Sequence, residues 1–370
     1  MCKRILASQT NTEEGVPFYK IGTIGNAPDA YISKELFDDY KTKYNYPHKG
    51  EVMITCAGTV GKCVIYDGKD AYYQDSNIVW IDNPSQCISN SFLYHLLAKV
   101  DWRKLNSTTI IRIYNDDLRN LKLNYPQIEE QQKISRLLSL LDERIATQNK
   151  IIDKLQSLIK GIGKQLFMDN PLWKKTYLRS FMQFFSTNSL SWEQLSYEEG
   201  EIRNLHYGLI HGFFTSGIKS YSLPMVKYGE MPKQYTLCQV GDVAFADASE
   251  DTDEIGKSVE FVDTIKGDTI CGLHTIHGRD IKNRTVVGFK GFAFNSRYFH
   301  NQIKRLAQGT KVFSITANNL SSCYVYLPDF DTQKAIVKLL KAYEEKLLVS
   351  KRLLEQYEKQ KQYLLRQMFI

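Results

Sequence analysis

Apolar residues recur in a seven-residue pattern in two long stretches of the chain, with polar residues between them. The stretches run from Pro126 to Phe167 and from Pro328 to Phe369, and they align without a gap at an offset of 202, with eight of 42 positions identical. A heptad pattern held over four heptads predicts a helix with one apolar seam, as in coiled coils. We therefore expect two equivalent helices of about 35 residues, each on the order of 50 Å long.

The heptad frame assigns the residues of each seam, and it places polar Gln148 and Ser350 at the same d position of the repeat. A buried polar residue can help to set the register of an antiparallel pair, at some cost in stability. The alternative is that each helix packs only on a neighbouring module, but the strict heptads and the absence of proline argue against it. The expected seam residues are Leu138, Leu141, Ile145, Ile152 and Leu155 in the first helix and Leu340, Tyr343, Leu347, Leu354 and Tyr357 in the second.

Outside the helices, short apolar runs alternate with turn residues. Runs at 49–55, 62–68 and 77–84 predict β-strands, and 91–97 predicts a packed helix. The second half repeats this plan, because 241–246 resembles 50–55 and 255–259 resembles 60–64. We predict an α+β fold, in which two mixed, mostly β modules alternate with two long helices. The predicted segments are 1–125, 126–170, 171–327 and 328–370.

Composition narrows the class of protein. The chain has 370 residues, of which 43% are hydrophobic and 24% are charged, and no apolar run reaches the roughly 20 residues that span a bilayer. Seven cysteines without a C-x-x-C pair favour a reducing, cytoplasmic compartment over a disulfide or zinc framework. The net charge of +7 is not gathered in a basic tail, so any nucleic acid would contact patches on folded modules.

One motif at the entry to the first helix resembles a known family. Residues 126–134, Pro-Gln-Ile-Glu-Glu-Gln-Gln-Lys-Ile, run into a Leu-rich stretch and resemble the helical conserved region of type I restriction-modification specificity (S) subunits. The second copy is similar, and 15–22 and 58–62 resemble segments of the target-recognition domains of that family. Gln308-Gly309-Thr310 resembles the stretch that precedes the second helix.

The resemblance implies a function divided between subunits. Each module would be a target-recognition domain that reads one half of a bipartite, asymmetric site on double-stranded DNA. The two helices would form an antiparallel coiled coil with pseudo-two-fold symmetry. It would set the spacing of the halves and hold two methyltransferase (M) subunits, and through them restriction (R) subunits. This chain would have no active site, cofactor or membrane contact, whereas S-adenosylmethionine, ATP and Mg²⁺ would belong to the partners.

Two features depart from the family pattern. Only some 15 residues precede Pro17, so we expect either a slightly truncated N-terminus or a first element completed by the C-terminal end. The second module also carries an acidic segment, Glu250–Glu254, where the first has Gly58-Thr59. Its carboxylates could accept from cytosine N4, but cation binding or exposure to solvent is the favoured interpretation.

Enzyme motifs are incomplete in this chain. Asn170-Pro171-Leu172-Trp173 resembles a methyltransferase loop with a wrong third residue, and its proline is better explained as a helix stop signal. Gly256-Lys257-Ser258 lacks the first glycine of a phosphate-binding loop. His274 and His277 are better explained as structural or DNA-contacting histidines, so no metal site is predicted. A stand-alone methyltransferase or nuclease, and a coiled-coil scaffold that does not read DNA, are the alternative functions.

Candidate DNA contacts follow from side-chain chemistry and position. Arginine and lysine pair with guanine or phosphate, glutamine and asparagine read adenine, and tyrosine can meet sugar or a thymine methyl. For each candidate, a solvated charge or a core aromatic is an equally good interpretation. The candidates are Thr59, Lys62, Tyr73, Gln74, Asn77 and Arg112 in the first module and Lys257, His274, Arg279, Lys282, Arg284 and Lys311 in the second.

Overall fold

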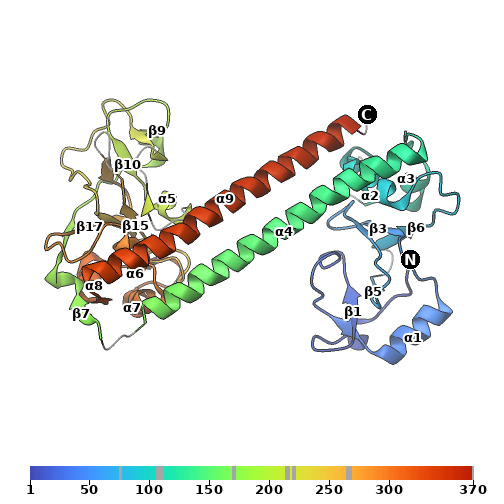
Figure 1. The fold of residues 1–370 in the computed structure, drawn as a ribbon, viewed down its shortest axis with the longest axis horizontal. Helices are drawn as coiled ribbons and strands as arrows, with labels where there is room; N and C mark the ends of the chain where they lie inside the picture. The colour runs from blue at the N-terminus through green and yellow to red at the C-terminus, as the bar shows by residue number, and fades with distance from the viewer. Residues whose placement is uncertain are drawn as a thin grey trace. The chain divides into compact units, whose positions relative to one another are not determined.

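The chain forms two compact units in a computed structural model that describes residues 1–74, 77–105, 112–168, 172–212, 217–218, 222–263 and 269–368. The first unit comprises Met1–Asn149 with Arg352–Ile370, and the second comprises Lys150–Lys351. Each unit therefore combines one globular module with a segment of both long helices (Figure 1). No helix among the described residues is long and apolar enough to cross a membrane.

The module of the first unit contains two small sheets. One has the order β2–β1–β5, and the other has the antiparallel order β4–β3–β6, which α2 covers through Leu93 and Leu97. The strands are β1 (Val16–Tyr19), β2 (Tyr31–Ile32), β3 (Val52–Thr55), β4 (Cys63–Ile65), β5 (Tyr72–Tyr73) and β6 (Ile78–Ile81). The helices are α1 (Lys34–Lys43), α2 (Asn90–Lys99) and α3 (Asn115–Arg119), with the short 3₁₀ helices η1 (Ala7–Gln9) and η2 (Trp102–Leu105).

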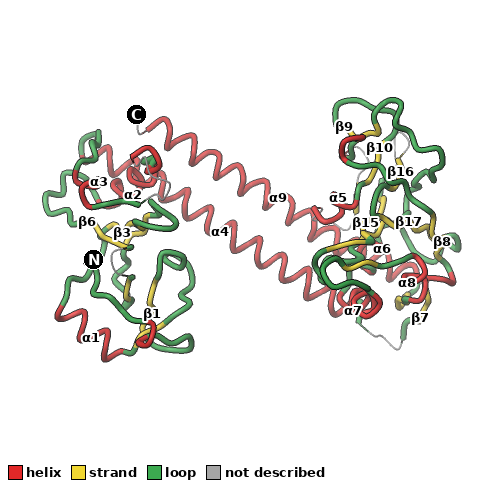
Figure 2. Tube along the Cα trace, turned by 180° about the vertical axis from the view of Figure 1, so that it is seen from behind, coloured by secondary structure: helices red, strands yellow, loops and turns green. Residues whose placement is uncertain are grey.

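The module of the second unit is built on a five-stranded sheet of order β11–β15–β13–β17–β8, beside a four-stranded sheet of order β16–β10–β12–β9 (Figure 2). The central β13 is apolar at every position and fully buried, as expected for a strand covered on both faces.

The strands of this module are β7 (Lys174–Tyr177), β8 (Met182–Phe185), β9 (Leu195–Ser196), β10 (Arg203–Leu205), β11 (Gly217–Ile218), β12 (Met225–Val226), β13 (Val243–Ala246), β14 (Ala248–Ser249), β15 (Ser258–Phe261), β16 (Thr269–Cys271), β17 (Thr275–Asp280), β18 (Phe313–Ser314) and β19 (Tyr324–Leu327). The helices are α5 (Tyr207–Gly212), α6 (Phe289–Ala293), α7 (Arg297–Leu306), α8 (Ala317–Ser322), η3 (Leu178–Ser180) and η4 (Trp192–Gln194).

The two heptad stretches form the long helices α4 (Ile128–Leu166) and α9 (Phe330–Met368), each of 39 residues. The α+β prediction is confirmed, and every predicted seam residue is buried or half-buried. In the first unit, Leu138 near the start of α4 packs with Leu364 near the end of α9. In the second unit, Leu166 at the end of α4 packs in one cluster with Ile336 near the start of α9. The paired segments are therefore antiparallel (Figure 1).

A buried glutamine at the start of each long helix makes the same hydrogen bonds in both units. Gln131 Oε1 accepts from Ser89 N–H at 2.8 Å, and its amide donates to the carbonyls of Cys87 and Pro126. Gln333, at the offset of 202, repeats this geometry.

Gln333 Oε1 accepts from Val286 N–H at 2.9 Å, and its amide donates to the carbonyls of Arg284 and Pro328. The turns that receive the two glutamines also match, because Gln86 and Asn283 both have a left-handed backbone, with φ of 51° and 50°. We call this arrangement the glutamine clamp. It shows that the sequence repeat is also a repeat of helix–module contacts.

Candidate nucleic-acid interface

The two units have an equivalent sheet edge where loops gather. In the first unit, Thr55 at the end of β3 lies opposite Ile78 of β6, and Ile54 lies opposite Cys63 of β4. In the second, Ala246 at the end of β13 lies opposite Thr275 of β17, and Phe245 opposite Ser258 of β15. Because neighbouring strands are antiparallel, one strand end and two strand starts share an edge in each unit. We call it the loop edge.

The loop edge of the first unit brings together most of the predicted DNA contacts of that module. Cys56 N–H donates to the Asn77 carbonyl at 2.7 Å, and Ile113 N–H donates to the Cys56 carbonyl at 2.9 Å. Those bonds place the segments before β6 and after residue 111 against the end of β3. The predicted residues gathered there are Thr59, Lys62, Gln74, Asn77 and Arg112.

The side chains on this edge are polar, and their charge is positive. Thr59 is exposed, and half-buried Lys62 has no ion-pair partner among the described residues. The Arg112 guanidinium lies 5.9 Å from the centre of the Tyr114 ring. Gln74 Oε1 accepts from Ile21 N–H at 3.2 Å, which fixes the direction of its amide. These five residues carry two cations and no carboxylate, a composition suited to phosphate and base edges.

Tyr73 is not part of this surface, so the prediction of a DNA contact is wrong for it. Its side chain is only 4% exposed, and its ring stacks on Tyr19 at 5.8 Å and meets Tyr66 edge-on at 6.0 Å. The neighbouring Tyr72 is buried as well. The cause is the parallel pairing of β5 with β1, which turns both rings into the core and raises the pKa of Tyr73 through burial.

The loop edge of the second unit has the same backbone plan. Asp247 N–H donates to the His274 carbonyl at 3.1 Å, and Ile315 N–H donates to the Asp247 carbonyl at 2.9 Å. The second bond matches the bond between Ile113 and Cys56, with the two isoleucines at the offset of 202. Lys257 precedes β15, and Lys311 precedes β18, which pairs with β14 beside Asp247. The edge therefore comprises Asp247, Glu254, Lys257, His274 and Lys311.

The chemistry of the second loop edge differs from that of the first, because acids and bases alternate on it. Lys257 Nζ lies 3.0 Å from Glu254 Oε2, and His274 Nδ1 lies 3.1 Å from Asp247 Oδ1. His211 of α5 also meets Glu254, at 3.1 Å. Partial burial raises the pKa of Asp247. For Glu254, burial acts in the same direction, but contacts with His211 and Lys257 outweigh it and hold the pKa below its usual value. This edge presents both donors and acceptors.

The acidic segment forms ion pairs within its unit. Asp253 pairs with Lys304 of α7, and Glu254 pairs with Lys257, whereas Glu250, Asp251 and Thr252 are exposed. Asp253 and Glu254 line a groove of about 1060 Å³ together with the last turns of α4 and with α7. The interpretation of a solvent-exposed segment therefore holds for its first three residues, whereas Asp253 and Glu254 form ion pairs.

Three other predicted contacts of the second unit lie away from its loop edge. Arg279 is near the far end of β17, where Nε and Nη2 donate to the two oxygens of Asp242 at 2.9 and 2.7 Å. Nη2 also reaches the Leu237 carbonyl at 2.8 Å. Arg279 is thus a structural residue on a strand and not a loop cation, which corrects the prediction. Lys282 and Arg284 are exposed, but they flank the turn of the glutamine clamp.

Sequence reasoning missed some residues of the second edge. Asp247 directly follows β13, and His211 and Tyr207 belong to α5, where the Tyr207 ring lies 5.3 Å from the His274 ring. No local motif marks them, because α5 and the end of β13 are distant in sequence. The one usable signal is the matched pair Ile113 and Ile315, whose backbone bonds locate both edges.

Comparisons with known proteins agree with this architecture. The family model described as type I restriction modification DNA specificity domain matches residues 1–157. A putative type I restriction enzyme specificity subunit, S.HindORF215P of Haemophilus influenzae, is 48% identical over 165 residues, which cover 45% of this chain and 42% of that protein. The chain thus aligns with less than half the length of that relative.

Two further comparisons span most of the chain. The putative type I restriction enzyme MjaX specificity subunit of Methanocaldococcus jannaschii is 25% identical over 386 residues, covering 96% of this chain and 87% of that one. The crystal structure of the type I restriction-modification S subunit from M. genitalium has a TM-score of 0.61 at 16% identity, over 100% of this chain and 92% of that one. In sequence and in fold, the chain is therefore similar to the specificity subunits of type I restriction-modification systems.

Proposed function

We propose that this chain is the DNA-recognition subunit of a type I restriction-modification complex, in which each loop edge reads one half of a bipartite, asymmetric site on double-stranded DNA. The observation that carries the proposal is that the two units share the same backbone contacts but have loop edges of different side-chain chemistry. The glutamine clamps and the bonds of Ile113 and Ile315 repeat, whereas the first edge is cationic and the second combines donors with acceptors. Two loop edges with different side chains on equivalent backbones suit the recognition of two different half-sites.

The long helices would serve as spacer and docking surface. At 1.5 Å per residue, a helix of 39 residues is about 58 Å long, which suits half-sites roughly one turn of duplex apart, about 34–36 Å. Exposed apolar side chains on both helices offer contact area for two methyltransferase subunits, and restriction subunits would join through them. These side chains are Leu137, Leu140, Ile151, Leu158, Leu339, Leu348, Val349 and Tyr363.

Catalysis would belong to the partner subunits, with S-adenosylmethionine, ATP and Mg²⁺ bound there. In the Gly256-Lys257-Ser258 turn, the lysine ammonium is bound by Glu254 and by the His211 carbonyl, so it is not directed at a phosphate. Asn170-Pro171 lies outside the described residues. The alternative of a stand-alone methyltransferase predicts labelled methyl transfer to DNA by the purified chain alone, and the proposed function predicts transfer only when methyltransferase subunits are added.

The loop edges can be tested by changing one of them. Selection from a random duplex pool, with methyltransferase subunits present, should recover a two-part motif. Lys62→Ala should relax the preference within one half only and weaken binding roughly tenfold, as expected for the loss of one specific cation contact. Lys49→Ala is the control, because Lys49 is exposed near the opposite end of β3. Recovery of a motif with a single part, or an equal effect of both variants, would contradict the proposal.

If the long helices set the distance between the two half-sites, shortening them should change that distance. Deletion of residues 145–151 from α4 and 347–353 from α9 removes one heptad from each helix and preserves the seam. Each helix becomes about 10 Å shorter, so the preferred gap should shrink by about three base pairs. A control of unchanged length carries alanine at the exposed positions of the same heptads. The two half-site preferences should be unchanged in the deletion variant. An unchanged gap between the half-sites in a folded deletion variant would refute the spacer role of the helices.

A further inference from the structure

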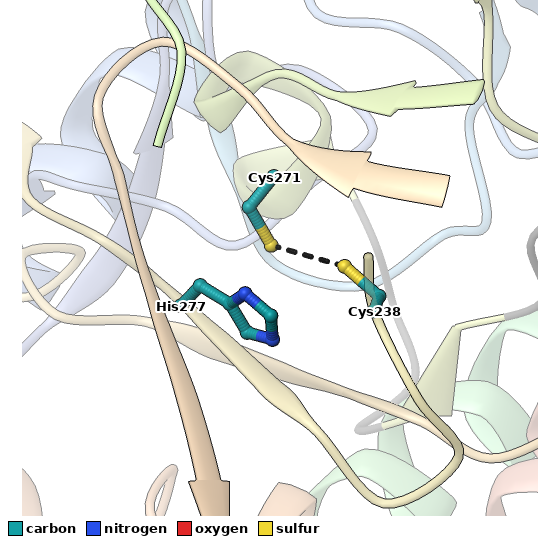
Figure 3. Close-up of side chains that lie close together, drawn as sticks. All are labelled: Cys238, Cys271 and His277. Atoms are coloured by element: carbon teal, nitrogen blue, oxygen red, sulfur yellow. Dashed lines mark hydrogen bonds between the residues drawn. The ribbon is translucent and has the colours of Figure 1, made fainter. Parts of the chain in front are cut away.

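Two cysteines and a histidine meet in the interior of the second unit (Figure 3). Cys238, Cys271 and His277 are 8%, 3% and 1% exposed, and the two sulfur atoms lie 3.5 Å apart. One ligand atom from each residue lies within 4.8 Å of the others. No sequence motif announces the group, because its members precede β13, end β16 and belong to β17. The fold therefore assembles a constellation that the sequence analysis did not expect.

The histidine ring is held in one orientation by a carboxylate. His277 Nε2 lies 2.7 Å from Asp242 Oδ2, and buried Asp242 also accepts two bonds from Arg279 and one from Gln239 N–H at 2.8 Å. With the Nε2 proton donated to Asp242, Nδ1 keeps a lone pair. A carboxylate that binds the second nitrogen is the usual support of a metal-binding histidine, since it fixes both tautomer and ring direction.

Charge balance permits a divalent ion in this interior. Asp242 and Arg279 neutralise each other, and His277 is neutral as a ligand. Two thiolates and one divalent cation also sum to zero, so binding would bury no uncompensated charge. Thiolate and imidazole ligands together select zinc among the common divalent ions, and a sulfur–sulfur distance of 3.5 Å is close to that of two thiolates on one ion, about 3.7 Å from zinc–sulfur bonds of about 2.3 Å.

We propose that Cys238, Cys271 and His277 bind a structural Zn²⁺ ion, with water as the fourth ligand. Cys271 belongs to the four-stranded sheet and His277 to the five-stranded sheet, so the ion would join the two sheets. It would also hold both ends of the turn that carries His274 of the loop edge. Thr269, on the same face of β16 as Cys271, has a buried hydroxyl without a partner among the described residues. That hydroxyl gives a metal-bound water a polar neighbour.

A disulfide is the competing use of the two sulfurs, and the geometry gives it less support. A disulfide would leave the convergent, carboxylate-bound histidine without a role. Bound zinc would stabilise the thiolates and block their oxidation.

The test is the zinc content of the full chain, which is purified without chelators and analysed by inductively coupled plasma mass spectrometry. We expect one zinc per chain in the wild type and a loss of nearly all of it in Cys238→Ser and Cys271→Ser. Cys323→Ser is the matched control, since Cys323 is another buried thiol of the same unit and lies outside the cluster. It should keep its zinc.

A second measurement does not depend on the folding of variants. Co²⁺ added to the metal-free wild-type chain should produce thiolate-to-cobalt charge-transfer absorption at one equivalent, and zinc should abolish it. The proposal is overturned if the wild type carries no zinc and gives no cobalt band. It is also overturned if Cys238→Ser retains full zinc, or if the intact mass shows the loss of two hydrogens expected of a disulfide between Cys238 and Cys271.

Discussion

Lys290→Met is expected to destabilise the second unit by about 3 to 5 kcal/mol, because it leaves the Glu260 carboxylate buried without its cation. The two side chains are 2% and 0% exposed, and Lys290 Nζ lies 2.9 Å from Glu260 Oε1, outside hydrogen-bond angles but in close ionic contact. Lys290 also donates to Thr285 Oγ1 at 2.9 Å, and Gly291 N–H donates to Glu260 Oε2 at 2.8 Å. Denaturant unfolding followed by a probe of the second unit measures the loss.

The matched control for this variant is Lys304→Met. Lys304 pairs with Asp253, but the two side chains are 35% and 73% exposed, so the expected loss is much smaller than for the buried pair. The double variant Glu260→Leu with Lys290→Met should recover part of the stability, since it removes both buried charges. Equal effects of Lys290→Met and Lys304→Met would show that the buried pair is not what stabilises this core.

Gln333→Leu is expected to cost about 2 to 4 kcal/mol, because it removes the partners of one partly buried backbone N–H and two carbonyls. Gln131→Leu should cost a similar amount in the first unit, where the same three contacts occur. Hydrogen exchange gives a residue-specific measurement: the Val286 amide should lose protection in Gln333→Leu, and the Ser89 amide in Gln131→Leu.

Gln132→Leu is the control for the clamp, because Gln132 is the exposed neighbour of Gln131 on α4. It should leave the protection of Ser89 unchanged. The clamp would be refuted as a stabilising contact if Gln131→Leu and Gln132→Leu had the same effect. If only one of the two clamp variants lost stability, the two helix entries would be alike in geometry but different in energy.

Local pattern predicted the helices well, and it predicted the candidate interface only in part. The heptads located seams whose members are buried or half-buried, since seam contacts repeat at a fixed spacing. The first loop edge was also predictable in large part, because Thr59, Lys62 and Asn77 flank strands that the sequence announces. The prediction of a DNA contact failed for Tyr73, because the direction of its side chain depends on the pairing of β5 with β1, which joins distant segments.

The second unit shows the same limit for charged and metal-binding residues. The residue type of Arg279 suggests a base contact, but Asp242, 37 residues earlier in the chain, occupies its guanidinium. Cys238 and Cys271 are 33 residues apart, so no spacing rule connects them, and only the meeting of the two sheets brings them to His277. Contacts of this kind depend on which sheet edge or face each segment joins.

The sequence by itself determined the repeat, the seam residues and the order of modules and helices, because each of these follows from periodicity within a contiguous stretch. The tertiary structure alone decided which polar residues remain available for recognition. It withdrew Tyr73 into the core and Arg279 into an ion pair, and it brought Asp247 and His211 to the second loop edge. The physical reason is that availability depends on burial and on charge partners, and both are set by segments that meet only when the chain folds.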